Sequence, residues 1–295
     1  MPAPRPSDQA LSAFRVQHDL VPLDGGRSLC YLAGDVVLKP SDEDEESQWI
    51  AAMVDRYFQG EPASEYTLAR PIPTVQDAES FVFDGWTASS LLPGRDGARG
   101  HFKESLRVSQ AFHRDLQKLA PIKPAFLDKR TNRWSEADRV TWGEKQLSDV
   151  AKINDEISAF YAEPLCELKA MMGPLPAHVS SQLIHADMAG NILWVDDGKT
   201  PPGIIDLSFH WRPFAYPEAI IVADGMAWHG QGRELIEFYG TDEVKLQLLV
   251  RALYWRCLTL TIDPIIEWVR QHAPRSDYHG AARLLREILN ERQNG

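Results

Sequence analysis

Residues 182–194 read QLIHADMAGNILW, and residues 203–206 read GIID. Two short apolar runs therefore lead into aspartates, Asp187 and Asp206, as strands of a small sheet would. Phosphoryl transfer needs an aspartate that accepts the proton of the attacking hydroxyl, and an asparagine and a second aspartate that hold Mg²⁺. Asp187, Asn191 and Asp206 supply these three groups in that order.

The same residues have a second interpretation. A polar turn between two buried strands would also contain His185, Asp187 and Asn191, with their side chains capping the local backbone. Motifs elsewhere in the chain are needed to choose between the phosphoryl-transfer motif and the polar turn.

Upstream of this motif, residues 14–92 are predicted to form short strands with one inserted helix. Strands are predicted at Ser28–Leu32, Val36–Lys39, Leu68–Pro73 and Phe81–Trp86. From Asp42 to Tyr57 apolar residues recur at helical spacing behind an acidic first turn, which suits the positive end of a helix dipole.

After Gly100 the pattern is helical, except for a β-like island at residues 183–205. Helices are predicted at Phe102–Leu119, Glu136–Trp142, Leu147–Met172 with a break at Pro164, Pro217–Trp228, Arg233–Tyr239, Glu243–Thr261, Ile265–His272 and His279–Glu291. The expected fold is α+β with two lobes, residues 1–92 and residues 93–295.

Composition excludes several classes of protein. The 295 residues are 44% hydrophobic and 25% charged, as in a folded globular protein, and the net charge is −11. An acidic chain is poorly suited to nucleic acid. No membrane span or signal peptide is recognisable, so no membrane partner and a cytoplasmic location are expected. Cys30, Cys166 and Cys257 suggest neither a disulfide framework nor a zinc site.

Taken together, these motifs resemble the aminoglycoside phosphotransferase and choline-kinase-like superfamily, the small-molecule relatives of protein kinases. The resemblance covers most of the chain, from about Leu20 to the C-terminal helices. Residues 190–193 (GNIL), 205–208 (IDLS) and 211–213 (WRP) resemble a little-characterised microbial branch of that superfamily.

The resemblance implies a bilobal protein-kinase-like fold with ATP and Mg²⁺ as cofactors, ATP in the cleft and a hydroxyl of a small molecule as the phosphate acceptor. It makes Asp187 the catalytic base, Asn191 and Asp206 metal ligands, and His185 a structural brace behind the loop. It does not separate ATP from GTP or identify the acceptor.

The sequence departs from the superfamily pattern in the loop after His185. Asn191 follows Asp187 by four residues, where the superfamily has five, and Ala186 stands where glycine is common. We expect Gly190 to adopt a positive φ that lets the shorter loop present Asn191 to a metal. The shortening also motivates an alternative function, a pseudokinase-like module that binds nucleotide or metabolite without turnover. A hydrolase using His185 and Asp187 is disfavoured because no nucleophile-elbow sequence is present.

In the N-terminal part, residues 36–40 (VVLKP) resemble the strand whose lysine contacts the α- and β-phosphates, which points to Lys39. A strand-end lysine that extends into solvent is the plain alternative. Glu46 shares a helical face with Trp49 and Met53 and is expected to pair with Lys39, with Glu45 as the alternative register.

Two further nucleotide contacts are expected from this half. The stretch Gly25-Gly26-Arg27-Ser28 can cover phosphates, because glycines let backbone N–H groups approach oxygen atoms closely. Backbone groups at Ser89 and Leu91 are expected to contact the adenine edge.

Three other residues each have two interpretations. Arg212 either contacts a phosphate or an anionic substrate, or forms a packing corner with Trp211. Asp224, on an apolar helix, needs a partner such as Arg212 or a helix cap, and substrate contact is the less favoured role. His113 is expected to be an ordinary residue at the edge of a helix core.

Overall fold

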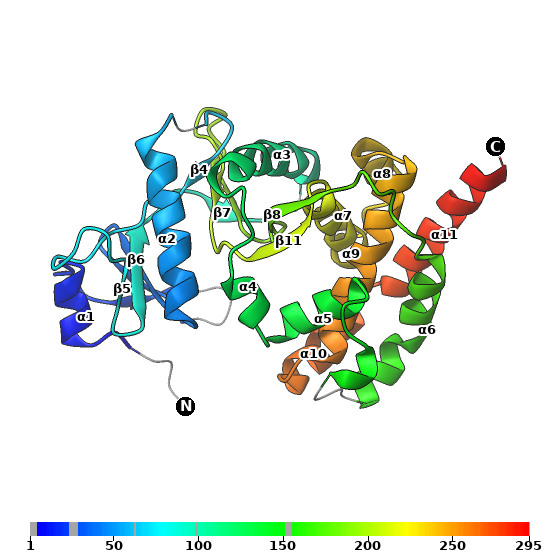
Figure 1. Cartoon of the computed structure of the whole chain (residues 1–295), viewed down its shortest axis with the longest axis horizontal. Coiled ribbons are helices and arrows are strands. Elements are labelled where there is room, and N and C mark those ends of the chain that lie inside the picture. Colours follow the sequence, from blue (N-terminus) through cyan, green and yellow to red (C-terminus); the bar gives the residue numbers. More distant parts are fainter. Residues whose placement is uncertain (1–4, 24–28, 62, 98–99, 151–154, 295) are drawn as a thin grey trace. The chain divides into compact units, whose positions relative to one another are not determined.

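The computed structural model describes residues 5–23, 29–61, 63–97, 100–150 and 155–294 (Figure 1). The chain divides into two compact units. The first consists of Met1–Asp96, Lys118–Ala120 and Ile192–Leu207, and the second of Gly97–Gln117, Pro121–Asn191 and Ser208–Gly295. The boundary between two lobes that the sequence suggests after residue 92 stays a prediction.

A five-stranded antiparallel sheet forms the larger part of the first unit, in the order β1-β2-β3-β6-β5. Its strands are β1 (Val21–Pro22), β2 (Tyr31–Ala33), β3 (Val36–Pro40), β5 (Val82–Phe83) and β6 (Trp86–Ser90). Helix α2 (Asp44–Gln59) follows β3, as predicted from its periodicity. A short helix that was not predicted, α1 (Asp8–Ala13), contributes Ala10 to the core formed with Leu38 and Trp86.

The predicted strand Phe81–Trp86 is wrong, because the chain reverses within it. Asp84 has φ 51° and Gly85 has φ 71°, so these two residues form the tight turn of a hairpin between β5 and β6. Asp-Gly pairs favour this turn because both central residues must adopt positive φ.

A second sheet explains why residues 192–207 belong to the first unit. Its order is β4-β10-β9-β7, with β4 (Thr67–Leu68) parallel to β10 (Gly203–Ile204), and β9 (Ile192–Trp194) antiparallel to both β10 and β7 (Arg95–Asp96). The sequence had placed these late strands in an island of the helical lobe. Their strand partners lie in the first 96 residues, which is why these strands belong to the first unit.

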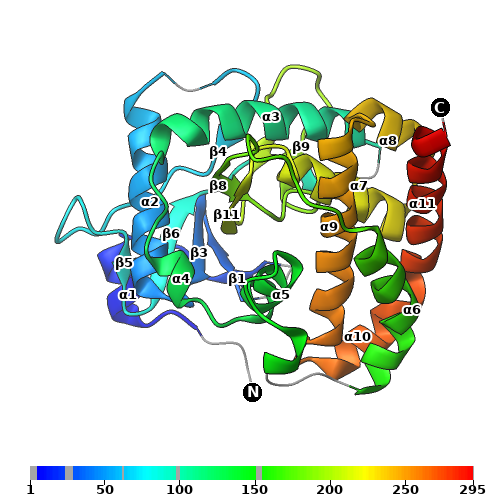
Figure 2. The same ribbon diagram turned by 45° about the vertical axis from the view of Figure 1, so that its right-hand side comes forward.

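The second unit is mainly helical (Figure 2). Its helices are α3 (Phe102–Leu119), α4 (Phe126–Lys129), α5 (Arg133–Thr141), α6 (Asp155–Met171), α7 (Tyr216–His229), α8 (Arg233–Tyr239), α9 (Glu243–Thr261), α10 (Ile266–His272) and α11 (Tyr278–Asn294), with short 3-10 turns at Leu147–Asp149 and Ala273–Arg275. Helix α9 packs against α5, α6, α7 and α11. The expected break at Pro164 is wrong, since α6 runs through it. No helix in the described part of the chain is long and apolar enough to cross a membrane.

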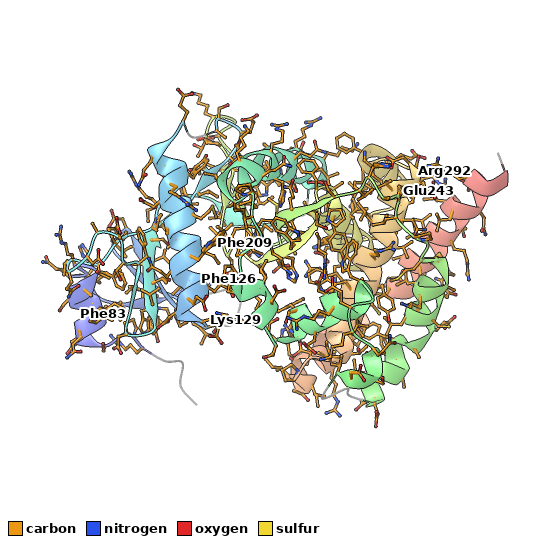
Figure 3. All side chains as sticks on the ribbon, viewed as in Figure 1. Phe83, Phe126, Lys129, Phe209, Glu243 and Arg292 are labelled. Atoms are coloured by element: carbon orange, nitrogen blue, oxygen red, sulfur yellow. The ribbon has the colours of Figure 1, made fainter. Side chains whose placement is uncertain are left out.

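A two-stranded antiparallel sheet, β8 (Ser181–His185) with β11 (Phe209–Pro213), lies among these helices. Helix α4 packs against β11; Figure 3 labels Phe126 on the helix and Phe209 on the strand. His185 pairs with Phe209 in the strand register, so the candidate catalytic loop leaves β8 at its buried end.

Candidate functional site

The loop after β8 carries His185 and Asp187 and is fixed at several points. His185 is fully buried, and its Nδ1 atom lies 3.4 Å from the backbone nitrogen of Asp187 and 3.2 Å from that of Ser208. The backbone nitrogen of Ala186 also donates to the Ser208 carbonyl at 2.9 Å. His185 therefore braces the loop against the start of β11, which is the role that the resemblance implies.

A second histidine, His113 on α3, holds the same strand end. Its Nε2 atom accepts the backbone N–H of His185 at 2.9 Å, while its Nδ1 atom lies 2.7 Å from the Ser109 carbonyl oxygen. Burial lowers the pKa of His113 to about 3, so the ring is neutral and can accept this hydrogen bond. From the sequence, His113 was expected to be only an ordinary residue at the edge of a helix core, because nothing in its helical spacing shows which strand it meets.

Asn191 closes the loop back onto Asp187. Its Nδ2 atom donates to the Asp187 carbonyl oxygen at 2.6 Å and lies 3.3 Å from Asp187 Oδ2. The backbone N–H of Asn191 donates to the Met188 carbonyl at 3.1 Å. The local capping considered from the sequence is thus present. Asn191 uses its amide nitrogen for this contact, which is the atom of the side chain that does not bind metal ions.

Gly190 does not behave as expected. Its backbone lies outside the left-handed region, and a Cβ atom placed on it would meet nothing within 4 Å. The predicted positive φ at Gly190 is therefore wrong. The loop closes instead through the contacts of Asn191 with Asp187 and Met188.

Asp187 also contacts an arginine that the sequence did not connect to it. Nη2 of Arg256, on α9, lies 2.6 Å from Asp187 Oδ1 and 2.7 Å from Asp224 Oδ2, so one guanidinium nitrogen joins two carboxylates. The side chains of Arg256 and Asp224 are 8% and 12% exposed, whereas that of Asp187 is 40% exposed. The expected partner of Asp224, Arg212, is wrong.

Burial and charge act against each other at Asp224. Burial raises the pKa of its carboxyl, Arg256 lowers it and Asp187 raises it, with a net value of about 6. The two carboxylates in turn raise the pKa of Arg256 above its ordinary value despite burial, so its guanidinium stays charged. The sequence held a weak signal for this pair: Asp224 and Arg256 each interrupt an apolar helix, and buried charges need partners.

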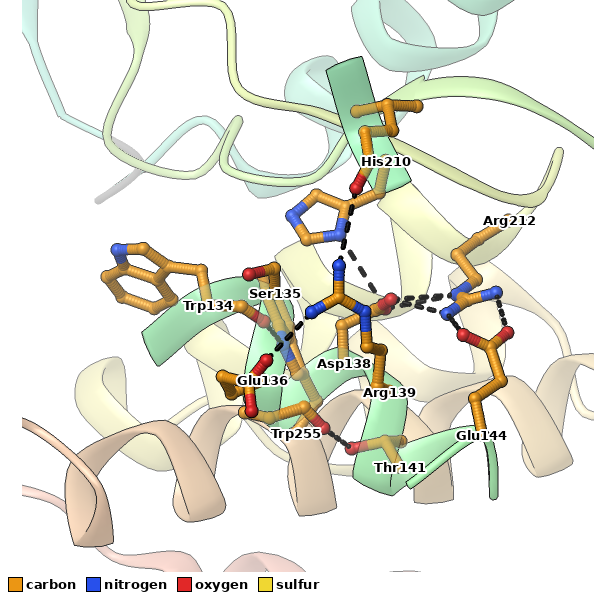
Figure 4. A network of polar contacts seen from close by, with 12 residues as sticks. Trp134, Ser135, Glu136, Asp138, Arg139, Thr141, Glu144, His210, Arg212 and Trp255 are labelled. Atoms are coloured by element: carbon orange, nitrogen blue, oxygen red, sulfur yellow. Dashed lines mark hydrogen bonds and ion pairs between the residues drawn. The ribbon is translucent and has the colours of Figure 1, made fainter. Parts of the chain in front are cut away.

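Arg212 takes the packing role of its two interpretations (Figure 4). Its guanidinium donates to Asp138, with Nε at 3.0 Å from Oδ2, and to Glu144, with Nη1 at 2.7 Å from Oε1. The group also lies 5.0 Å from the centre of the Trp142 ring, not against Trp211. Arg212 thus ties β11 to α5 and the turn after it.

In the first unit, Lys39 on β3 forms an ion pair with Asp206, which follows β10. Asp206 has φ 51°, the left-handed conformation that few residues other than glycine adopt. Such strained positions concentrate at functional sites. Because both side chains are about half exposed, at 51% and 55%, this ion pair contributes little to stability.

The charge state of Lys39 follows from its neighbours. Although the Lys39 side chain is about half exposed, loss of water around its ammonium group lowers its pKa. Asp206, through its charge and hydrogen bond, and the weaker effects of Cys30 and Asp42 outweigh this. The net pKa is raised, so Lys39 is positively charged at neutral pH. Of the two carboxylates considered in the first turn of α2, Glu46 is half-buried and Glu45 exposed.

The remaining nucleotide contacts stay predictions, including the pair between Lys39 and Glu46. Ser89 pairs with Val37 in the sheet, and the backbone N–H of Leu91 donates to the Asp35 carbonyl at 2.8 Å. An adenine contact at Leu91 would therefore use its carbonyl oxygen. Gly25, Gly26 and Ser28 lie outside the described residues.

The two residues predicted to bind a metal, Asn191 and Asp206, both carry oxygen atoms of the kind that Mg²⁺ prefers. Mg²⁺ is usually held by one or two protein oxygens together with phosphate oxygens and water. In the second unit, Asn191 has turned its nitrogen toward Asp187, which leaves its amide oxygen facing away from that contact. In the first unit, the Asp206 carboxylate is paired with Lys39. Their shared role as metal ligands stays a prediction. Within the described ranges, no group of three or more His, Cys, Asp or Glu residues is arranged to hold a metal ion by itself.

Comparison with known proteins establishes the fold. No protein-family model and no curated protein matches the sequence. Among solved structures, an aminoglycoside phosphotransferase from Alicyclobacillus acidocaldarius matches with a TM-score of 0.57 and 14% identity, over 100% of this chain and 98% of that one. Spectinomycin phosphotransferase APH(9)-Ia, in complex with ADP and spectinomycin, matches with a TM-score of 0.52 and 14% identity, over 97% and 94%.

Choline kinase LicA from Streptococcus pneumoniae matches with a TM-score of 0.51 and 10% identity, over 96% of this chain and 97% of that one. Identities this low show the fold alone. The α+β architecture predicted from the sequence is confirmed, and the chain has the protein-kinase-like fold of the aminoglycoside phosphotransferases and choline kinases.

Proposed function

We propose that this protein is an ATP- and Mg²⁺-dependent phosphotransferase that acts on a hydroxyl group of a small molecule. The observation that carries the proposal is the Asp187 loop. Asp187 carries a half-exposed carboxylate, and its backbone is held by the buried His185 and by Asn191. These residues follow one another in the order that phosphoryl transfer requires.

In this proposal Asp187 accepts the proton of the acceptor hydroxyl as its oxygen attacks the γ-phosphorus, and the bond from that phosphorus to the ADP oxygen breaks. An exposed carboxylate oxygen can approach the acceptor, while the fixed backbone around it sets the direction of approach. Catalysis then depends mainly on positioning and on charge neutralisation.

Lys39 would neutralise charge on the nucleotide phosphates, and its positive charge at neutral pH supports that role. Asn191 and Asp206 would hold Mg²⁺, which when bound neutralises the developing charge on the phosphate oxygens. Glu46, half-buried on α2, would orient Lys39 once Asp206 turns to the metal.

A second candidate function is a nucleotide-binding module without turnover. The observation in its favour is the ion pair between Asp187 and Arg256. A carboxylate that is neutralised by an arginine is a weaker base, so Asp187 would accept a proton less readily. The two functions differ in what Asp187 does.

Two matched substitutions distinguish them. Asp187→Asn should abolish phosphate transfer and leave Mg-ATP affinity nearly intact, because Asp187 acts on the acceptor proton. Asp206→Asn should weaken both, because it removes a metal ligand. Transfer from radiolabelled ATP to spectinomycin, kanamycin, choline and ethanolamine gives the activity, and calorimetric titration with Mg-ATP gives the affinity. A wild-type protein that binds Mg-ATP but transfers to none of these acceptors, nor to water, supports the binding module.

A further inference from the structure

We propose that Arg256 is the positioning residue of the Asp187 base, and that Asp224 anchors Arg256 for this task. The inference rests on the proposed function, because it assigns the residue that orients the catalytic carboxylate. It concerns α7 and α9, which the kinase motifs of the sequence do not include.

Arg256 contacts a buried carboxylate, Asp224, and an exposed one, Asp187. Nη2 of Arg256 is shared between Asp224 Oδ2 at 2.7 Å and Asp187 Oδ1 at 2.6 Å. Asp224 is buried on α7, whose residues are buried almost throughout, so its position is fixed by packing. Asp187 is the exposed end of the chain of contacts, and it is the only member of the three with a surface open to an acceptor.

Aromatic rings fix the guanidinium further. Its central carbon lies 4.8 Å from the centre of the Trp255 ring and 5.6 Å from that of Trp134. Cation–π contacts with desolvated arginine favour a defined position of the planar group. Arg256 is therefore held by Asp224 and two rings independently of Asp187, as a positioning group must be.

The two carboxylate oxygens of Asp187 have different hydrogen-bond partners. Oδ1 accepts the short hydrogen bond from Arg256, and Oδ2 has only the 3.3 Å approach of Asn191 Nδ2 among its described contacts. Oδ2 is thus the oxygen that takes the proton of the acceptor. Without Arg256, an exposed aspartate would populate several rotamers and meet the hydroxyl less often in the productive one.

A purely structural role for Arg256, as a buried counter-charge for Asp224, predicts different behaviour. Its loss would then lower the melting temperature without a specific effect on turnover. Arg251 provides the control for this possibility. It lies on the same helix, donates to the Gly173 carbonyl at 2.7 Å and lies 5.4 Å from the centre of the Trp142 ring, but it has no contact with Asp187 in the described structure.

The test compares Arg256→Ala, Arg256→Lys and Arg251→Ala in phosphate transfer from Mg-ATP, to the best acceptor of the panel above or to water. Arg256→Ala should lower kcat by about tenfold to a hundredfold, with KM for Mg-ATP changed less than about threefold. Arg256→Lys should be intermediate. Guanidinium chloride at non-denaturing concentration should restore part of the kcat of Arg256→Ala. Arg251→Ala should lower the melting temperature, keep kcat and gain nothing from guanidinium.

A double substitution adds a check on the shared role. Asp187→Asn with Arg256→Ala should be no slower than Asp187→Asn alone, because Arg256 acts through Asp187. If Arg256→Ala does not fold, Arg256→Gln with Asp224→Asn removes both buried charges together and is assayed instead. An unchanged kcat in the folded variants that lack the guanidinium, or the same loss in Arg251→Ala, overturns the inference.

Failure of the proposed function gives a different result. In that case the wild-type protein transfers no phosphate at all, and crystal structures of Arg256→Ala and Arg251→Ala decide the positioning role. The Asp187 carboxylate should change rotamer in the first and keep it in the second. The same rotamer in both structures contradicts the inference whatever the activity.

Discussion

At the scale of single residues, the backbone at Gly34 requires a glycine, whereas the backbone at Gly190 would accept a side chain. Gly34, in the turn between β2 and β3, has φ 65°, and a Cβ atom on it would lie 2.6 Å from the His18 ring. Gly190 has neither constraint. We expect Gly34→Ala to lower the free energy of unfolding by about 1–2 kcal/mol, and Gly190→Ala to change it by less than about 0.5 kcal/mol. Urea denaturation of both variants measures this. A larger loss in Gly190→Ala than in Gly34→Ala would contradict the backbone description of the candidate catalytic loop.

At the scale of elements, a buried acid joins α7 to α3. Glu218 is fully buried and accepts a hydrogen bond from Ser109 Oγ. Burial raises its pKa from 4.5 to about 7, against the smaller lowering effect of Ser109. Between about pH 4.5 and 7 the folded protein keeps a proton that the unfolded chain releases, so this residue makes stability fall as pH rises through that window.

Glu218→Gln should therefore stabilise the protein above pH 7, by on the order of 3 kcal/mol, and have little effect below pH 4.5. The amide oxygen can still accept from Ser109. Melting temperatures from pH 4 to 9 measure the difference. The control is Glu237→Gln, on the exposed side of α8, which should change the free energy of unfolding by less than about 0.5 kcal/mol, as surface substitutions usually do. A Glu218→Gln variant less stable than wild type at pH 8 would show that the carboxylate is charged and compensated.

At the scale of the whole molecule, the proposed nucleotide should stabilise the fold. A ligand that binds only the folded protein adds about 2.7 kcal/mol at a free concentration of 100 times its Kd. Mg-ATP should thus raise the melting temperature in a saturable way, and GTP tested in parallel gives the base preference. Lys39→Met should weaken the shift, since it removes a positive charge expected on the phosphates. If neither nucleotide raises the melting temperature at millimolar concentration, the proposed nucleotide contacts, including that of Lys39, are all wrong.

The sequence alone determined the features that depend on local chemistry. The periodicity of residues 42–57 and 243–261 predicted α2 and α9, because a helix needs only its own apolar spacing and end residues. The order of His185, Asp187, Asn191 and Asp206 carries the family resemblance from which the kinase-like fold was predicted. Where a local signal was misread, as at Asp84-Gly85 and Pro164, the error was confined to one element.

Only the tertiary structure decided which distant residues meet. It paired β10 with β4 and so moved residues 192–207 out of the helical lobe. It joined Arg256 to Asp187 and Asp224, and His113 to the backbone of His185. The physical reason is that a buried charge or an unpaired strand edge is costly without a partner, so the sequence shows that a partner is needed. Which group becomes the partner depends on which residues the packing of the chain brings close, and this is not visible in the sequence.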